Sequence, residues 1–458
     1  MPAVYPFRAV QYKQGKGDVS TEIAPPYDVL DAKQKAALLE QNPANVVGFD
    51  LPHVPAKELG PPEAYSGAAD AYRKYLADGV LAQRERPAMF AYRQTFEYLG
   101  KTYQRSGMAV TVDTRPLGPS TDGKGGILPH EQTFSGPKED RMALMKASRT
   151  QFSPVFGLHP DEDGAATAIL HEVMASREPD LTGRLADGVL HEVWTVEDEA
   201  TIRRYQQALD GEDVFIADGH HRYNTAVNYL AHLQEQGDLP PDHPARRTMI
   251  VLVGMSDPGL VIGPTHRVLG GMQDYSIEAF QKAAQGILEI EAIENDPKLI
   301  ERSMESALAR GHHNVFGLLD YATGLCFTAW PAVDDPLEDK FPKKPEAWRR
   351  LDVALIQHLI VEDICVPALN RGEEIKWAFP HSIDEVIAIG RGEETGSAIK
   401  GGGRPQLAII VRPTPLDAVR DVSKANELMP QKSTFFYPKL ATGLFIKSLE
   451  PQPAAVTA

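Results

Sequence analysis

Short apolar runs alternate with amphipathic stretches along most of the chain. Runs of β-type residues predict strands at Ala88–Tyr92, Val214–Ala217, Thr248–Val253 and Gln406–Val411. Apolar positions spaced three and four residues apart predict helices at Ala32–Glu40, Lys138–Ala147, Arg222–Gln236, Ile277–Ile287 and Leu416–Leu428. Strands that alternate with helices in this way predict a mixed α/β (α+β) protein.

The length of 458 residues suggests two or three domains, at roughly 100–200 residues per domain. A glycine and three prolines within Gly237–Arg247 follow a predicted helix and precede a predicted strand, so we place a domain boundary there. The expected parts are an N-terminal domain (1–236), a C-terminal α/β domain (237–449) and a loose tail (450–458).

Composition excludes several classes of protein. The chain has 63 acidic and 47 basic residues and a formal net charge of -16, which disfavours binding to nucleic acid through clustered Lys and Arg. No apolar run approaches the ~18 residues that cross a membrane, and the first residues lack the apolar core of a secretory signal. We therefore expect a cytoplasmic protein that binds neither nucleic acid nor membrane.

Cys326 and Cys365 lack paired spacing, so we expect them to be buried thiols.

The strongest candidate for chemistry is Asp218-Gly219-His220-His221-Arg222, between a predicted strand and a predicted helix. Gly219 permits a tight turn, and Asp218 is placed to cap the helix. The N–H groups of the first helical turn, together with the two histidines and Arg222, are suited to binding phosphate. The alternative is a plain helix start with Arg222 paired to a surface carboxylate. Adjacent side chains diverge on a helix, so we expect no metal site at the two histidines.

A second cluster surrounds His130 and Glu131, which follow the end of a probable strand at Leu128. The helix that begins after this segment carries Lys138 and Arg141. A charged first turn of a helix is the alternative interpretation.

The two motifs together resemble those of the ADP-dependent free serine kinases. They are Leu128-Pro129-His130-Glu131 and, downstream, the segment Asp218–Arg222. The core of those kinases has a ParB/sulfiredoxin-like fold. The resemblance implies that Glu131 acts as the base and that Asp218–Arg222 holds the phosphates of the donor. It also implies a ParB/sulfiredoxin-like core with an additional α/β domain.

A nearly end-to-end resemblance identifies the chain as a member of the bacterial and archaeal family called domain of unknown function 1015. The segments that carry it are Ala24–Asp28, Tyr92–Gln94, Leu128–Glu131, Ser135–Arg141, Ala217–Tyr223, Pro264–Arg267 and Met429–Lys439. The family name carries little chemistry, so the functional prediction depends on the residues and on the shorter resemblance.

Three further segments could complete a site. The loop Met429–Lys439 contains two prolines and offers donors for a second phosphate or a carboxylate. They are Gln431, Lys432, Ser433, Thr434 and Lys439. A basic turn contains His266 and Arg267. We interpret Ala24–Asp28 as a rigid turn, although it could bring Asp28 to a metal or an amine. No GxxxxGK[ST] loop or GxGxxG fingerprint is present, which argues against a P-loop or Rossmann enzyme.

The resulting prediction is a small-molecule phosphotransferase, most concretely a free L-serine kinase that uses Mg²⁺ and a nucleotide or pyrophosphate donor. Phosphate binding is assigned to Asp218–Arg222 and Lys432. Substrate binding is assigned to His130, Lys138, Arg141, His266, Arg267, Ser433 and Thr434. Arg222→Ala and Glu131→Gln are each expected to reduce turnover by about 10²–10³-fold with the fold intact. A ParB-like nucleotide-binding regulator and a metal-dependent phosphohydrolase are the alternatives, and oligomeric state stays open.

Overall fold

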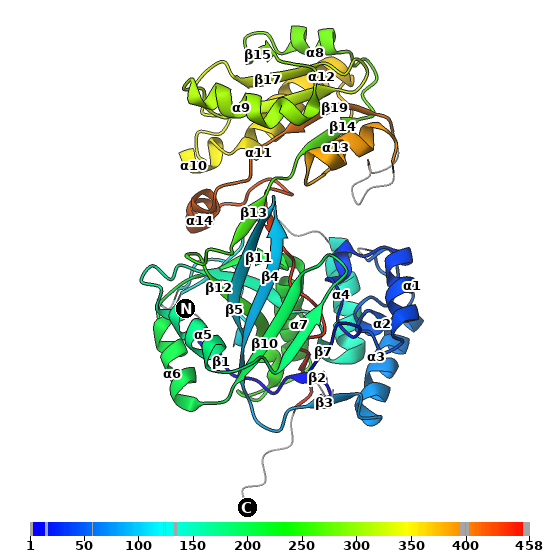
Figure 1. Cartoon of the computed structure of the whole chain (residues 1–458), viewed down its shortest axis with the longest axis vertical. Coiled ribbons are helices and arrows are strands. Elements are labelled where there is room, and N and C mark those ends of the chain that lie inside the picture. Colours follow the sequence, from blue (N-terminus) through cyan, green and yellow to red (C-terminus); the bar gives the residue numbers. More distant parts are fainter. Residues whose placement is uncertain are drawn as a thin grey trace, which may run out of the picture. The chain divides into compact units, whose positions relative to one another are not determined.

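The computed structural model describes residues 3–13, 17–56, 58–121, 123, 125–131, 135–393, 399 and 403–451. The chain forms two compact units (Figure 1). Unit 1 comprises Met1–Pro129, Thr133–Val261 and Pro438–Ala458, and unit 2 comprises His130–Gln132 and Ile262–Tyr437. The boundary predicted after residue 236 therefore differs from the observed division, because the strand that follows it belongs to unit 1. Most of the predicted tail, residues 452–458, lies outside the described residues.

Unit 1 contains a mixed β-sheet, which has nine strands among the described residues. These strands are β1 (Val4–Tyr5), β4 (Met89–Tyr98), β5 (Lys101–Asp113), β6 (Ile127–Leu128), β8 (Val155–His159), β9 (Leu181–Arg184), β10 (Leu190–Val196), β11 (Val214–Asp218) and β12 (Arg247–Gly254). Their order is β6-β11-β8-β12-β5-β4-β10-β9, and β1 pairs with β5. β6 and β11 are parallel, so the chain leaves both strands at the same edge of the sheet.

Two short ribbons also belong to unit 1. β2 (Val10–Tyr12) pairs with β3 (Leu81–Gln83), and β7 (Thr150–Gln151) pairs with β21 (Lys447–Ser448). The second ribbon pairs the C-terminal segment with residues about 300 positions earlier in the chain. Just before β21, the Phe445 ring contacts two rings of the sheet. Its centroid lies 5.3 Å from that of Phe90 and 5.8 Å from that of Tyr92.

Helices cover the sheet of unit 1. They are α1 (Ala32–Gln41), α2 (Val47–Asp50), α3 (Pro62–Ala77), α4 (Ser135–Ser148), α5 (Ala165–Ser176), α6 (Glu199–Ala208) and α7 (His220–Glu235), with 3₁₀ turns at Tyr27–Val29 and Pro244–Arg246. Leu170 of α5 and Tyr205 of α6 pack into the same core as Trp194 and Val110 of the sheet. Helices α1–α4 gather on one side of the unit (Figure 1).

Unit 2 is built on an antiparallel sheet of six strands among its described residues, in the order β15-β17-β16-β19-β14-β18. The strands are β14 (Arg267–Gly270), β15 (Leu288–Ala292), β16 (Phe316–Asp320), β17 (Cys326–Pro331), β18 (Lys376–Ala378) and β19 (Pro405–Ile410), with the short strands β13 (Val261–Gly263) and β20 (Phe435–Tyr437) outside it. The helices are α8 (Ile277–Ala283), α9 (Ile300–Ala309), α10 (Glu346–Arg349), α11 (Asp352–Leu355), α12 (Val366–Leu369), α13 (Ile383–Gly390) and α14 (Leu416–Lys424), with a 3₁₀ turn at Pro297–Leu299 and a π-helix, η4, at Ile356–Cys365.

The structure confirms the mixed α/β class and each strand and helix proposed from the pattern. Two helices end earlier than predicted. α8 ends before Gly286, which has a φ of 76°, and α14 ends before Asn426, which has a φ of 55°. Both residues adopt the left-handed conformation that cannot continue a right-handed helix.

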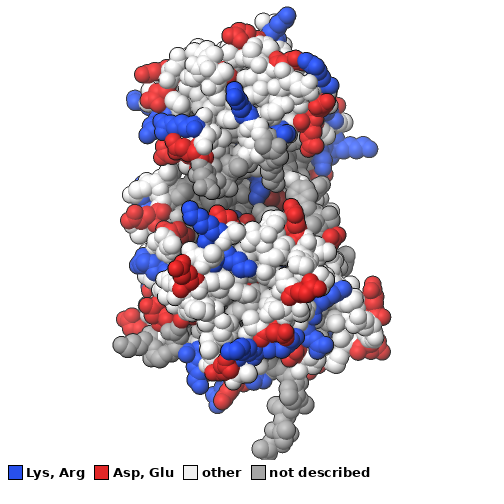
Figure 2. All heavy atoms as spheres, turned by 90° about the vertical axis from the view of Figure 1, so that its right-hand side faces the viewer, with Lys and Arg blue, Asp and Glu red and all other residues white. Residues whose placement is uncertain are grey.

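Cys326 and Cys365 are both buried, as predicted, and burial raises the pKa of their thiols to about 11 and about 12. Within the part of the chain that the structure describes, no helix is both long and apolar enough to span a bilayer. On the face shown in Figure 2, acidic and basic side chains are intermixed.

Lys447 is a buried cation in the C-terminal segment of unit 1. Its Nζ donates to the Pro244 carbonyl at 2.7 Å. Burial, with a smaller effect from Arg247, lowers the pKa of this amine from 10.5 to about 7. Between pH 7 and about pH 10 the unfolded chain therefore binds the proton more strongly, and the stability contributed by this group rises with pH.

We expect Lys447→Met to raise the melting temperature at pH 6, because it removes a buried charge, and to raise it much less at pH 10. Calorimetry at pH 6, 8 and 10 measures the effect. Lys74→Met, at an exposed lysine of the same unit, serves as the control. A shift that is the same at all three pH values would show that the buried amine is not charged at pH 6.

Candidate functional site

The turn between β11 and α7 agrees with the sequence prediction at Gly219 and differs from it at Asp218. Gly219 precedes α7 with a φ of 90°, and a Cβ at this position would lie 3.0 Å from the guanidinium carbon of Arg222. The predicted cap by Asp218 is wrong, since Gly219 occupies the N-cap position of α7. The first N–H groups of α7 have no acceptor within the helix, as at the start of any α-helix.

Asp218 instead forms two ion pairs. Its Oδ2 accepts from Nη2 of Arg222 at 2.6 Å, and its Oδ1 accepts from Nζ of Lys439 at 2.9 Å. Burial alone would raise the pKa of Asp218, but the charges of Lys439 and Arg222 outweigh it and hold that pKa well below its usual range. Asp218 is therefore a carboxylate that fixes two cations at the start of α7.

Arg222 is more enclosed than the sequence suggests. Its side chain is 9% exposed, and its Nη1 donates to the Pro154 carbonyl. Burial opposes its charge, yet Asp218 and Asp28 raise its pKa above the usual value. The guanidinium fork expected to bind phosphate is thus engaged by protein acceptors. Arg222→Ala would remove these contacts, so this variant is not expected to leave the fold intact.

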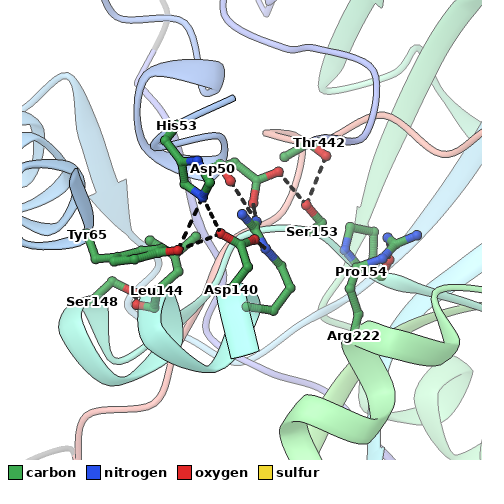
Figure 3. A network of polar contacts seen from close by, with 11 residues as sticks. Asp50, His53, Tyr65, Asp140, Leu144, Ser148, Ser153, Pro154, Arg222 and Thr442 are labelled. Carbon is green, nitrogen blue, oxygen red and sulfur yellow. Dashed lines mark hydrogen bonds and ion pairs between the residues drawn. The ribbon is translucent and has the colours of Figure 1, made fainter. Parts of the chain in front are cut away.

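A buried network of polar side chains lies next to Arg222 (Figure 3). Arg141 donates from Nε to Asp140 Oδ2 at 2.7 Å and from Nη1 to the Asp50 carbonyl, also at 2.7 Å. Asp140 Oδ1 accepts from the Tyr65 hydroxyl at 2.8 Å and lies 3.0 Å from His53 Nε2. Three elements, α2, α3 and α4, are joined by these contacts.

A cavity of about 40 Å³ separates Arg141 from Arg222. Asp50 and Ser153 also line it, and Asp50 accepts from the Ser153 hydroxyl at 2.7 Å. Arg141 Nη2 is buried and has no hydrogen-bond partner among the described residues. The space is sufficient for about three or four water molecules at about 10–15 Å³ each, and too small for a phosphorylated substrate. The contacts of Arg141 therefore stabilise the interior of unit 1.

Lys138 does not join Arg141. It lines a different, open pocket of about 370 Å³ with Leu59, Met142 and Lys146. The two side chains were predicted to act together because both follow the start of α4, but they face different surroundings.

In unit 2, Glu131 and His130 contact the loop that precedes β20. Glu131 Oε1 accepts from the backbone N–H groups of Ser433 at 3.0 Å and Thr434 at 3.4 Å. His130 is fully buried, and its Nε2 lies 2.8 Å from the Thr434 hydroxyl. The structure therefore brings together two sequence motifs that lie about 300 residues apart.

Arg267 belongs to the same group in unit 2. It donates from Nη2 to the Lys432 carbonyl at 3.0 Å and from Nη1 to the Thr265 carbonyl. Burial lowers its pKa to about 10, and the charge of Glu131 acts in the opposite direction. The Lys432 side chain is exposed.

His266 is the remaining predicted residue of this group. Its Nδ1 accepts from the Val411 N–H at 3.2 Å. Burial lowers its pKa to about 3, with further contributions from Arg267 and His381, so it is a neutral imidazole near pH 7. It is a poor candidate for donating a charged hydrogen bond to substrate.

Sequence reasoning did not assign Asp50 or Asp140 to a site, and it named Lys439 only as one of the donors of the 429–439 loop. The sequence signal for Lys439 as a site residue was its position directly after the last proline of the 429–439 loop. Asp50 and Asp140 stand in helices where a single acidic residue has no distinguishing pattern. Among the described residues, no cluster of three or more His, Cys, Asp or Glu side chains could hold a metal ion.

Comparison with solved structures finds distant neighbours. One is free serine kinase in complex with AMP, at 13% identity and a TM-score of 0.32, covering 73% of this chain and 92% of the kinase. Another is a conserved hypothetical protein from Pyrococcus furiosus, at 14% identity and a TM-score of 0.31, covering 72% and 93%. A third is SbnI with a C-terminal truncation from Staphylococcus aureus, at 8% identity and a TM-score of 0.30, covering 73% and 85%. Scores of this size do not establish a shared arrangement of the whole chain.

No curated protein matches the sequence. The family model described as protein of unknown function (DUF1015) matches residues 4–354 of the 458. The match includes the Leu128–Glu131 and Asp218–Arg222 motifs and ends before the 429–439 loop. The chain belongs to the DUF1015 family.

Proposed function

We propose that the protein transfers a phosphoryl group to the hydroxyl group of a small molecule, most concretely L-serine, to form O-phospho-L-serine. The observation that carries the proposal is the position of the first turn of α7 directly after the paired Asp218 and Lys439. The N–H groups at the positive end of a 16-residue helix, next to a lysine, favour the negative charge of a phosphate.

In this proposal the N–H groups of His220 and His221 hold the transferring phosphoryl group, and Lys439 neutralises its charge. Asp218 positions Lys439, and Arg222 positions Asp218. Arg222 is therefore a positioning residue. This differs from the phosphate-binding role that the sequence alone indicates.

Glu131 keeps the role of base that the resemblance implies. In the reaction, the serine oxygen forms a bond to the terminal phosphorus of the donor, and the bond between that phosphorus and the leaving phosphate oxygen breaks. The hydroxyl proton passes to the Glu131 carboxylate. Backbone N–H groups of Ser433 and Thr434 hold one oxygen of that carboxylate, which fixes its orientation.

Mg²⁺ stays a prediction. This ion commonly takes one or two protein carboxylates and completes its shell with water and phosphate oxygens. In unit 1, Asp28 fits such a role because its Oδ1 is buried without a hydrogen-bond partner among the described residues. When bound, Mg²⁺ would supply charge neutralisation for the donor phosphates.

Phosphorus NMR tests the proposal. Purified protein is incubated with Mg²⁺ and L-serine and, separately, with ATP, ADP or pyrophosphate. We expect the phosphoserine resonance to appear with at least one donor and to require both serine and protein. Hydrolysis of a donor without phosphoserine would instead indicate a phosphohydrolase, and no reaction with any donor would remove the kinase proposal.

A further inference from the structure

Unit 2 contains a pocket of about 980 Å³ that the phosphoryl-transfer proposal does not use. Small-molecule sites commonly have volumes of about 300–1,000 Å³ and are lined mainly by apolar and aromatic side chains. The walls here include aromatic rings from three separate parts of unit 2: Phe341, Trp348, His358, Trp377 and Phe379. The volume and the lining both point to a bound organic molecule.

Two of these rings are stacked on one another at one wall. Trp377 of β18 and Phe379, two residues later, lie with ring centroids 5.8 Å apart and planes within 8° of parallel. Both side chains are only partly buried. Alternate residues of an extended chain point to the same side, and both rings line the pocket. A planar ring can stack on such a surface.

The other aromatic wall is rigid. Trp348 is buried and its Nε1 donates to the Leu428 carbonyl at 2.8 Å. The His358 ring lies 5.4 Å from the Trp348 ring and 4.6 Å from the Phe341 ring, centroid to centroid. His358 is also held by Glu362 at 2.9 Å from its Nδ1. The rings are thus oriented before any ligand binds.

His358 stands on the π-helix η4, ten residues long, which supplies part of the same wall. π-Helical geometry is rare and occurs frequently at functional sites, since it is less favourable than the α-helix it replaces. Here it contributes Gln357, His358 and Glu362 to the pocket.

Three cations also line the pocket: Arg267, Lys344 and Lys376. The Arg267 guanidinium lies 5.4 Å from the Phe379 ring, and Lys344 Nζ lies 5.1 Å from the Trp348 ring. Lys344 is also paired with Glu427, so the positive charge beside the stacking surfaces comes mainly from Arg267 and Lys376. A ligand with a planar ring and an anionic group complements this combination.

We propose that this pocket binds a nucleotide, with its base stacked on Trp377 and Phe379 and its phosphate directed to the cations. The pocket belongs to unit 2 alone, so the proposal goes beyond the phosphoryl transfer assigned above and does not depend on it. Glu362 and Glu374 at the pocket wall supply acceptors for amino groups of a base.

Calorimetric titration of the full-length protein with ATP, ADP and AMP tests the proposal. Trp377→Ala is expected to weaken the binding of the nucleotide about 5–150-fold, the range for loss of one base-stacking ring. Trp377→Phe should retain most of the affinity. The control is Trp330→Phe, because Trp330 stacks on His312 at 3.9 Å and is not part of the pocket lining.

Lys376→Met provides a second variant that does not alter a packed ring, since Lys376 is exposed. It should weaken the binding of ATP more than the binding of adenosine. Unchanged ATP affinity in both Trp377→Ala and Lys376→Met, or no nucleotide binding by the wild type at millimolar concentration, would overturn the proposal. Phosphoserine formation is measured separately, so nucleotide binding without phosphoserine would contradict only the kinase proposal.

Discussion

Replacement of Glu131 with Gln is expected to reduce phosphoserine formation at least about 10²-fold, as typical for loss of a general base. Gln retains an Oε1 atom that can accept from the N–H groups of Ser433 and Thr434, so the local structure should persist. The rate is measured with saturating serine and the donor identified by phosphorus NMR. Circular dichroism and the melting temperature verify the fold.

Glu385→Gln is the matched control for this experiment. Glu385 is also in unit 2, and its Oε2 accepts from the His381 backbone N–H at 2.6 Å. The substitution removes the same charge from a similar hydrogen bond, and turnover should stay close to that of the wild type. Equal activity of the wild type and Glu131→Gln would show that Glu131 is not the base.

The second large effect concerns stability. Asp140 is fully buried and is bound by Arg141 and Tyr65. Asp140→Ala removes the nearer of the two carboxylates that pair with the buried guanidinium of Arg141 and leaves only Asp50, at 3.3 Å from Nη1. Loss of one partner of a buried ion pair typically costs about 3–5 kcal/mol. This is a large fraction of the free energy of unfolding of a typical domain, about 5–15 kcal/mol.

Chemical denaturation measures the change, with Asp70→Ala as the control. Asp70 pairs with Arg73 at 2.8 Å on an exposed helix surface, where such pairs contribute less than about 1 kcal/mol. If Asp140→Ala destabilised the protein no more than Asp70→Ala, the buried network would not be a main determinant of the stability of unit 1.

The pattern of apolar residues predicted the elements well because most of them bury apolar side chains, either on one face or, in a central strand, on both. β12, for example, has a continuous apolar run from Met249 to Val253. The pattern could not predict the division into units. The glycine and prolines after residue 236 mark a loop within unit 1. The chain returns to unit 1 at Pro438, and this return depends on the pairing of β21 with β7, almost 300 residues apart.

The candidate site was predictable where a motif itself fixes local geometry. Gly219 is an instance, since its positive φ follows from a strand that turns directly into a helix. The partners of the motif were not predictable. Asp218 could cap α7 or bind distant cations, and only the position of Lys439, 221 residues later, decides between these two roles. Arg222 likewise became a buried positioning residue through Pro154 and Asp218.

The central claim is that the start of α7 binds the transferring phosphoryl group. Hydrogen exchange of the peptide 214–225, with and without Mg²⁺ and the phosphoryl donor, tests it most directly. We predict slower exchange of the His220 and His221 amides when the donor is bound, and loss of that protection in Lys439→Met. Unchanged exchange in this peptide, at donor concentrations that calorimetry shows to be saturating, would contradict the claim.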